Sequence, residues 1–153
     1  MATHLVRTFG AELHVEDEGS GLAILCLHSL AGSLRMWDVV AAGLRRHMRV
    51  VRFDARGHGR SAGNGNFSVE RNAEDALAVA DALKLPSCVV LGISMGGQTA
   101  IRAALLRPSI ASSSKCTTVS LRAVTMPHCS STIRPSGRLA KRACGLTGVR
   151  SGN

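Results

Sequence analysis

The sequence contains no apolar run as long as the ~18 residues of a membrane-spanning helix, so it offers no transmembrane segment. The first ten residues lack the basic-then-apolar pattern of a secretory signal peptide. The five cysteines are odd in number and have no paired spacing, which argues against a disulfide framework and a zinc site. We therefore expect a cytoplasmic protein without cofactor, metal or membrane partner, in which Cys26 and Cys88 are buried thiols.

The sequence also has no acidic residue after Asp81. Residues 109–153 carry seven Lys and Arg residues but no acid and no aromatic residue, whereas residues 1–108 are nearly balanced in charge. The net charge of +9 therefore comes mostly from one segment rich in Ser and Thr. Because this segment lacks aromatic residues for base stacking, we expect no nucleic-acid partner.

From residue 22 onward, apolar runs of strand length alternate with segments of helical period, which is typical of a parallel α/β sheet. Ser33 is the candidate cap of the first helix, and Pro108 ends the last one. The first helix is expected to turn Met36, Trp37, Val40, Ala41 and Leu44 toward the core. The expected strands cover 4–9, 12–16, 22–27, 49–53, 87–91 and, beyond Pro108, 119–126; the expected helices cover 33–47, 68–85 and 97–106.

The strongest functional signal is a G-x-S-x-G motif at 92–96, which follows the expected strand 87–91 and opens the helix 97–106. At such a turn the serine has a strained backbone, and its hydroxyl projects outward. The glycines let the strand and the helix approach closely, and the next amide points toward developing negative charge. The motif predicts Ser94 as a nucleophile and the Met95 N–H as an oxyanion donor. The alternative is a chance match in a sequence rich in glycine and serine.

Two further loops follow the strands at 22–27 and 49–53. The first reads His28-Ser-Leu-Ala-Gly-Ser33. The second reads Asp54-Ala-Arg-Gly-His-Gly-Arg-Ser61, and for it we expect a structural role in which Asp54 binds local amides and Arg56. His58 is interpreted as a loop residue rather than a catalytic base. No Walker lysine follows these glycines, which excludes a phosphate loop.

The order and spacing of these three motifs resemble the α/β-hydrolase superfamily over residues 5–108. Within it, residues 29–38, 52–59 and 91–97 are similar to 3-oxoadipate enol-lactonases, which hydrolyse the ring ester of a small carboxylated lactone. The resemblance implies an α/β-hydrolase fold and a small-molecule ester or lactone substrate. It also implies that the Leu30 N–H is the second oxyanion donor, although Ser29 replaces the glycine of the family's H-G-x-x-G loop.

Members of this superfamily place an acid and then a histidine after the nucleophile. Here no acid follows Ser94, and His128, in the setting Met-Pro-His-Cys, is the one histidine that does. His128 is therefore the candidate base. We predict that residues 1–108 form the N-terminal part of the fold only, with a truncated and mostly parallel sheet. We predict that residues 109–153 form an irregular basic tail without a selected fold, and that activity is impaired.

A frameshift in or just after the codon for Pro108 is our hypothesis for this change in composition. With GC-rich codons, the bases encoding Ser-Ile-Ala-Ser-Ser-Ser, read one position earlier, encode Glu-His-Arg-Val-Val-Val, which fits the family's continuation. Sequencing the gene tests this hypothesis. An absence of any frame with a hydrolase-like continuation containing Asp and His would exclude it.

Two other interpretations stay open. In the first, the chain is a non-enzymatic remnant or binding module whose basic segment contacts nucleic acid or an anionic surface through Arg138, Lys141 and Arg142. In the second, a separate polypeptide supplies further strands, as in a swapped oligomer. The oligomeric state itself is left open.

Overall fold

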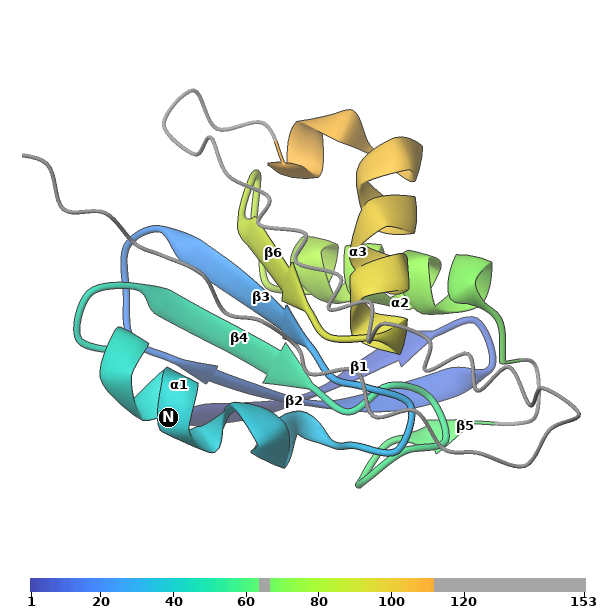
Figure 1. Cartoon of the computed structure of the whole chain (residues 1–153), viewed down its shortest axis with the longest axis horizontal. Coiled ribbons are helices and arrows are strands. Elements are labelled where there is room, and N and C mark those ends of the chain that lie inside the picture. The colour runs from blue at the N-terminus through green and yellow to red at the C-terminus, as the bar shows by residue number, and fades with distance from the viewer. Residues whose placement is uncertain (64–66, 112–153) are drawn as a thin grey trace, which may run out of the picture. The chain divides into compact units, whose positions relative to one another are not determined.

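The computed structural model describes residues 1–63 and 67–111, which form a mixed β-sheet with helices on both faces (Figure 1). The strand order is β1-β2-β4-β3-β6, and the short strand β5 pairs with the start of β2. β1 and β2 cover the expected strands 4–9 and 12–16 and form an antiparallel hairpin, whereas β3, β4 and β6 run parallel to one another. The strands are β1 (Ala2–Thr8), β2 (Ala11–Glu18), β3 (Ala23–Leu27), β4 (Arg49–Phe53), β5 (Ala62–Gly63) and β6 (Val89–Gly92).

Two of the helical elements begin directly after a serine that caps them. The Ser33 hydroxyl accepts the Arg35 N–H at 3.3 Å, and the Ser68 hydroxyl accepts the Arg71 N–H at 3.1 Å. Among the described residues, no helix is both long and apolar enough to cross a membrane. The helical elements are the 3₁₀ turn η1 (Leu34–Trp37), α1 (Asp38–Leu44), α2 (Val69–Ala82), α3 (Met95–Leu106) and the 3₁₀ turn η2 (Pro108–Ala111).

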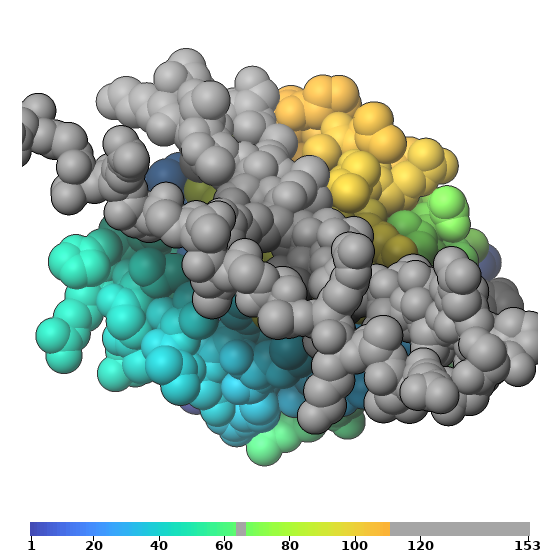
Figure 2. Space-filling model, in the orientation of Figure 1, coloured from blue at the N-terminus to red at the C-terminus, as the bar shows by residue number. Residues whose placement is uncertain are grey.

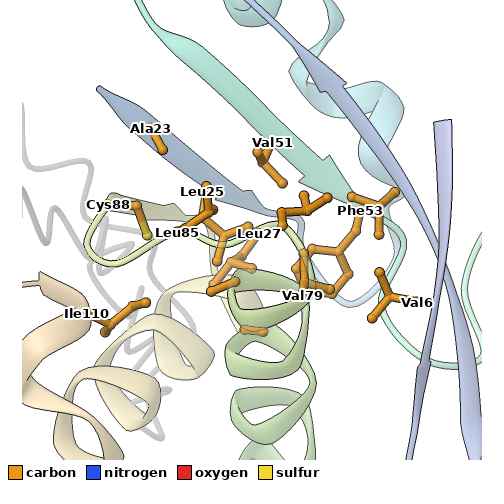
Figure 3. Packing of buried hydrophobic residues seen from close by; sticks show 14 of the residues in the cluster. Val6, Ala23, Leu25, Leu27, Val51, Phe53, Val79, Leu85, Cys88 and Ile110 are labelled. Carbon is orange, nitrogen blue, oxygen red and sulfur yellow. The ribbon is translucent and has the colours of Figure 1, made fainter. Parts of the chain in front are cut away.

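Alternate residues of β3 supply the two faces of the sheet, as the two-residue period of a strand requires. Ile24 and Cys26 pack with Trp37 and Ala41 on the α1 side. Residues from the other face form the larger cluster beneath α2 and α3, including Leu25, Leu27, Val51, Phe53 and Val79 (Figure 3). A strand that is buried on both faces therefore reads as a continuous apolar run.

α2 and α3 also pack against one another, as the adjoining green and yellow surfaces in Figure 2 show. An exposed ion pair joins their C-terminal ends, because both guanidinium NH groups of Arg107 bind the Asp81 carboxylate. The Arg107 hydrogen bonds lower the pKa of Asp81. Beyond α3, Ile110 is buried, and its carbonyl accepts the Cys88 N–H at 2.8 Å, so η2 is tied to the residue just before β6.

Two local expectations differ from the structure. The segment expected as one helix at 33–47 starts as a 3₁₀ turn, whose three-residue period rotates the buried face. Leu34 is consequently buried, whereas Met36 and Val40 are exposed. β5 was expected to be loop, because two residues give no periodic signal. The expected strand 119–126 lies outside the described residues.

Candidate active site

Ser94 lies at the junction of β6 and α3, in the conformation expected of a strand-to-helix elbow. It occupies the N-cap position of α3, and its backbone angles are φ 53° and ψ −115°. A positive φ is sterically unfavourable for any residue with a Cβ atom. Only one other described non-glycine residue, Lys84, has a positive φ. The Ser94 side chain is exposed, whereas its neighbour Met95 is buried.

The two motif glycines allow this turn because neither position has space for a Cβ atom. A Cβ at Gly92 would overlap the backbone of Gly96, on the first turn of α3. A Cβ at Gly96 would overlap the carbonyl of Leu27, at the end of β3. The Ile93 N–H also donates to the Leu27 carbonyl at 3.2 Å. The elbow therefore packs directly against the end of the neighbouring parallel strand, β3.

The loop after β3 is organised by the buried side chain of His28. Its Nε2 accepts the Ala55 N–H at 2.9 Å, so the ring proton is on Nδ1 and is donated to the Ser29 carbonyl at 2.7 Å. The Gly32 N–H donates to the same carbonyl at 2.9 Å. Because a trans peptide points its C=O and N–H in opposite directions, these bonds also orient the Leu30 N–H. Burial is the main cause that lowers the pKa of His28, which keeps the ring neutral.

Asp54 joins this loop to the loop after β4. The buried carboxylate accepts the Leu34 N–H through Oδ1 at 2.7 Å and the Arg60 N–H through Oδ2 at 2.9 Å. Its carbonyl accepts the Ser61 hydroxyl at 2.6 Å. The expectation that Asp54 binds local amides is confirmed. The expectation that it also binds Arg56 is wrong.

Arg56 binds Asp75 of α2 instead. Its Nε and NH2 groups donate to the two carboxylate oxygens at 2.8 and 2.6 Å, and both side chains are buried. Asp75 lies within α2, and the sequence alone assigned it no role. Its position on the core face beside Asn72 and Ala76 was the available signal, since a buried charge needs a partner.

His58 has both ring nitrogens directed at backbone carbonyl groups. Nδ1 lies 2.9 Å from the Arg56 oxygen, and Nε2 lies 2.5 Å from the Leu30 oxygen, across the gap between the two loops. The ring centroid is 5.2 Å from that of His28 and 5.8 Å from that of Phe67. This geometry agrees with the interpretation of His58 as a loop residue, but no sequence pattern indicated its contact with Leu30.

A cavity of about 10 Å³ lies beneath the elbow, with room for about one water molecule and none for a substrate. Asn72 and Thr99 line it, and neither side-chain amide nor hydroxyl has a hydrogen-bond partner among the described residues. The cavity lies between the ends of β3 and β4 and the helices α2 and α3.

The fold brings the predicted residues Ser94, Met95 and Leu30 to the same end of the sheet. Leu27, the last residue of β3, pairs with Gly92, the last residue of β6, so the segments that follow them start side by side. The predicted base, His128, lies outside the described residues.

A protein family and several individual proteins match this chain. The family model described as "alpha/beta hydrolase fold" matches residues 23–136. The chain is 38% identical over 94 residues to 3-oxoadipate enol-lactonase 1 of Acinetobacter baylyi, a match covering 60% of this chain and 35% of that protein. It is 39% identical over 90 residues to the sn-1-specific diacylglycerol lipase ABHD11 of Mus musculus, covering 58% and 29% of the two chains.

A solved structure, Est816, described as an N-acyl homoserine lactone degrading enzyme, superimposes with a TM-score of 0.67 at 31% identity. The match covers 69% of this chain and 41% of that one. The chain spans about a third of the length of the curated relatives that it matches.

Proposed function

The chain belongs to the α/β-hydrolase family, and we propose that it is a serine hydrolase of carboxylic esters or lactones with Ser94 as the nucleophile. The observation that carries this proposal is the positive φ of Ser94 between β6 and α3. A strained, exposed serine between two glycines without space for a side chain is hard to explain by packing alone. Strain of this kind is typical of positions that present a reactive group.

In the proposed reaction, the Ser94 Oγ attacks the carbonyl carbon of the ester, and the carbonyl oxygen becomes an oxyanion. The Met95 N–H is one of the first amides of α3, which have no partner within the helix. We propose that this amide and the Leu30 N–H donate to the oxyanion. Collapse of the intermediate breaks the ester bond and releases the alcohol, and water then attacks the acyl-enzyme and releases the acid.

The proton of Ser94 needs a base. Neither of the two histidines on the adjoining loops suits this role, because His28 and His58 already bind backbone groups through both ring nitrogens. Within this sequence His128 is the candidate base, and no acid after Ser94 is present to orient it. We therefore propose that this chain acylates slowly, because its sequence holds no acid after Ser94 to orient a base.

The substrate class is proposed from the relatives. The names of the three compared proteins refer to an enol-lactonase, a lipase and a lactone-degrading enzyme, and all three activities break a carboxylic ester bond. That shared chemistry supports an ester or lactone carbonyl as the reacting group.

The test is labelling of the full chain with a fluorophosphonate, followed by intact-mass and peptide mass spectrometry. We expect slow incorporation of one phosphonyl group at Ser94 and none in Ser94→Ala. Ser20→Ala, which removes an exposed hydroxyl from a turn, is the matched control and should label like the wild type. Exclusive labelling at another residue would refute the proposal. Labelling as fast as in the enol-lactonase would mean that a working base is present.

A further inference from the structure

The ring of His58 bridges the loop after β4 and the loop after β3. Its Nε2 lies 2.5 Å from the Leu30 carbonyl oxygen, and its Nδ1 lies 2.9 Å from the Arg56 carbonyl oxygen on its own loop. Each contact places a ring nitrogen against a carbonyl oxygen, and a carbonyl oxygen only accepts hydrogen bonds. Because neutral imidazole has a single N–H, only the doubly protonated ring makes both bonds.

Two histidine rings link these loops in different ways. His28 holds the Ser29 carbonyl, and it does so as a neutral ring because its Nε2 must accept the Ala55 N–H. His58 holds the next carbonyl along the chain, that of Leu30, and its bridge depends on a second proton. Two successive carbonyl groups, those of Ser29 and Leu30, are thus each held by a histidine ring.

We propose that His58 is a positioning residue that fixes the Leu30 segment while its ring is doubly protonated and loosens it when one proton leaves. Loss of either proton turns a nitrogen lone pair toward a carbonyl oxygen and breaks one of the two bonds. The ring then no longer couples the two loops. The effect of His58 on oxyanion stabilisation rests on the proposed function, in which the Leu30 N–H is a donor.

Two ring side chains lie against the His58 ring. The neighbouring ring from the loop after β3 is His28, which stays neutral, and the ring from the segment before α2 is Phe67, which has no charge. The charged side chains of its own loop are engaged elsewhere or exposed. Asp54 accepts two amides, Arg56 binds Asp75, and Arg60 is exposed.

The test is an NMR titration of the full chain labelled with ¹⁵N, which requires no catalytic activity. At low pH we expect both His58 ring nitrogens to be protonated. The Ala31 N–H shares its peptide group with the Leu30 carbonyl, so its chemical shift should follow the His58 titration with the same midpoint. An Ala31 amide that stays constant while the His58 ring titrates would overturn the proposal.

Two variants test whether His58 or another histidine controls the chemical shift of the Ala31 amide. In His58→Gln the side chain keeps a donor but has no proton to lose near neutral pH, so the Ala31 shift should become independent of pH. His47→Gln is the matched control, because His47 is exposed and precedes β4, and its titration curve should equal that of the wild type. If the Ala31 shift still titrates in His58→Gln, another group controls the loop and the proposal is wrong.

Fluorophosphonate labelling then addresses the catalytic consequence separately. We expect the labelling rate of Ser94 to fall several-fold in His58→Gln at a pH where wild-type His58 is doubly protonated. A wild-type chain that never labels at Ser94 would refute the proposed function, whereas the NMR titration would still decide the role of His58.

Discussion

Arg56 and Asp75 form a buried ion pair that joins the loop after β4 to α2 through two parallel hydrogen bonds. The Arg56 NH2 group also lies 3.4 Å from the Phe9 carbonyl, at the turn between β1 and β2. One guanidinium group therefore connects three segments that are distant in the sequence. The loop after β4 also carries His58. The ion pair therefore anchors the loop from which the His58 ring contacts the Leu30 carbonyl.

Removal of one partner of this pair should be costly. Asp75→Asn or Arg56→Met leaves an unpaired buried charge, and we expect a loss of about 3–5 kcal/mol in the free energy of unfolding. The double variant Arg56→Met/Asp75→Leu should recover much of this loss, because no buried charge remains. Urea unfolding followed by circular dichroism measures both effects.

The exposed pair between Arg107 and Asp81 is the control. It also has two hydrogen bonds from a guanidinium to a carboxylate, but both side chains are partly exposed to solvent. Arg107→Met should cost at most about 1 kcal/mol. Equal losses for the two pairs would contradict the argument from burial.

The elbow glycines should not tolerate alanine. In Gly92→Ala or Gly96→Ala the new methyl group meets backbone atoms that cannot move without separating α3 from the sheet. We expect a loss of at least about 3 kcal/mol, or failure to fold. Gly43→Ala is the matched control, since a Cβ there meets nothing within 4 Å inside α1, and it should stabilise the chain by about 0.5–1 kcal/mol. Thermal unfolding of the three variants makes the comparison.

Relief of backbone strain should distinguish Ser94 from an ordinary serine. Ser94→Gly should raise the free energy of unfolding by about 1 kcal/mol, because glycine adopts a positive φ freely. Ser94→Ala should leave it nearly unchanged, while both variants lose fluorophosphonate labelling.

Lys84 is the control for this measurement, because it too has a φ of 53°. It follows the end of α2, where the Leu85 N–H donates to the Ala80 carbonyl in a helix-ending turn that favours glycine. Lys84→Gly should therefore stabilise the chain by a similar amount without affecting labelling. A stability gain at Lys84 but not at Ser94 would show that the elbow is unstrained.

The neutral state of His28 should appear in the pH dependence of stability. Its pKa in the folded protein lies below the ordinary value of 6.5, mainly because burial disfavours the charged ring. The unfolded chain therefore takes up a proton first as the pH falls, and stability present above about pH 6.5 is lost below it. In His28→Gln this part of the slope should disappear, and stability at pH 7.5 should fall by about 1–3 kcal/mol. Urea unfolding between pH 5 and 8 tests this, and His47→Gln should retain the wild-type slope.

The two buried thiols should be unreactive in the folded protein. Burial raises the pKa of Cys26 to about 12 and that of Cys88 to about 11, so almost no thiolate forms at pH 8. Peptide mapping after iodoacetamide treatment should find both cysteines unmodified without denaturant and alkylated in urea. Rapid alkylation of either one in the native chain would show that its part of the sheet opens readily.

The order of strands and helices and the location of the elbow could be predicted because their signals are local. β3 is an unbroken apolar run because both of its faces are buried, and the caps Ser33 and Ser68 act within three residues of their own position. The elbow was recognisable because its glycines and Ser94 are adjacent in the sequence, and their close packing requires that spacing. Interactions that depend on residues close together in the sequence therefore determined these features.

Tertiary structure alone decided which charged and polar groups meet. Arg56 had an acid two residues away in Asp54, yet its partner is Asp75, because Asp54 is turned toward the Leu34 and Arg60 amides. The link from His58 to Leu30 likewise joins residues 28 positions apart. Hydrogen bonds and ion pairs depend on ångström-scale distance and direction, which arise only when the parallel strands bring their loops to one edge of the sheet.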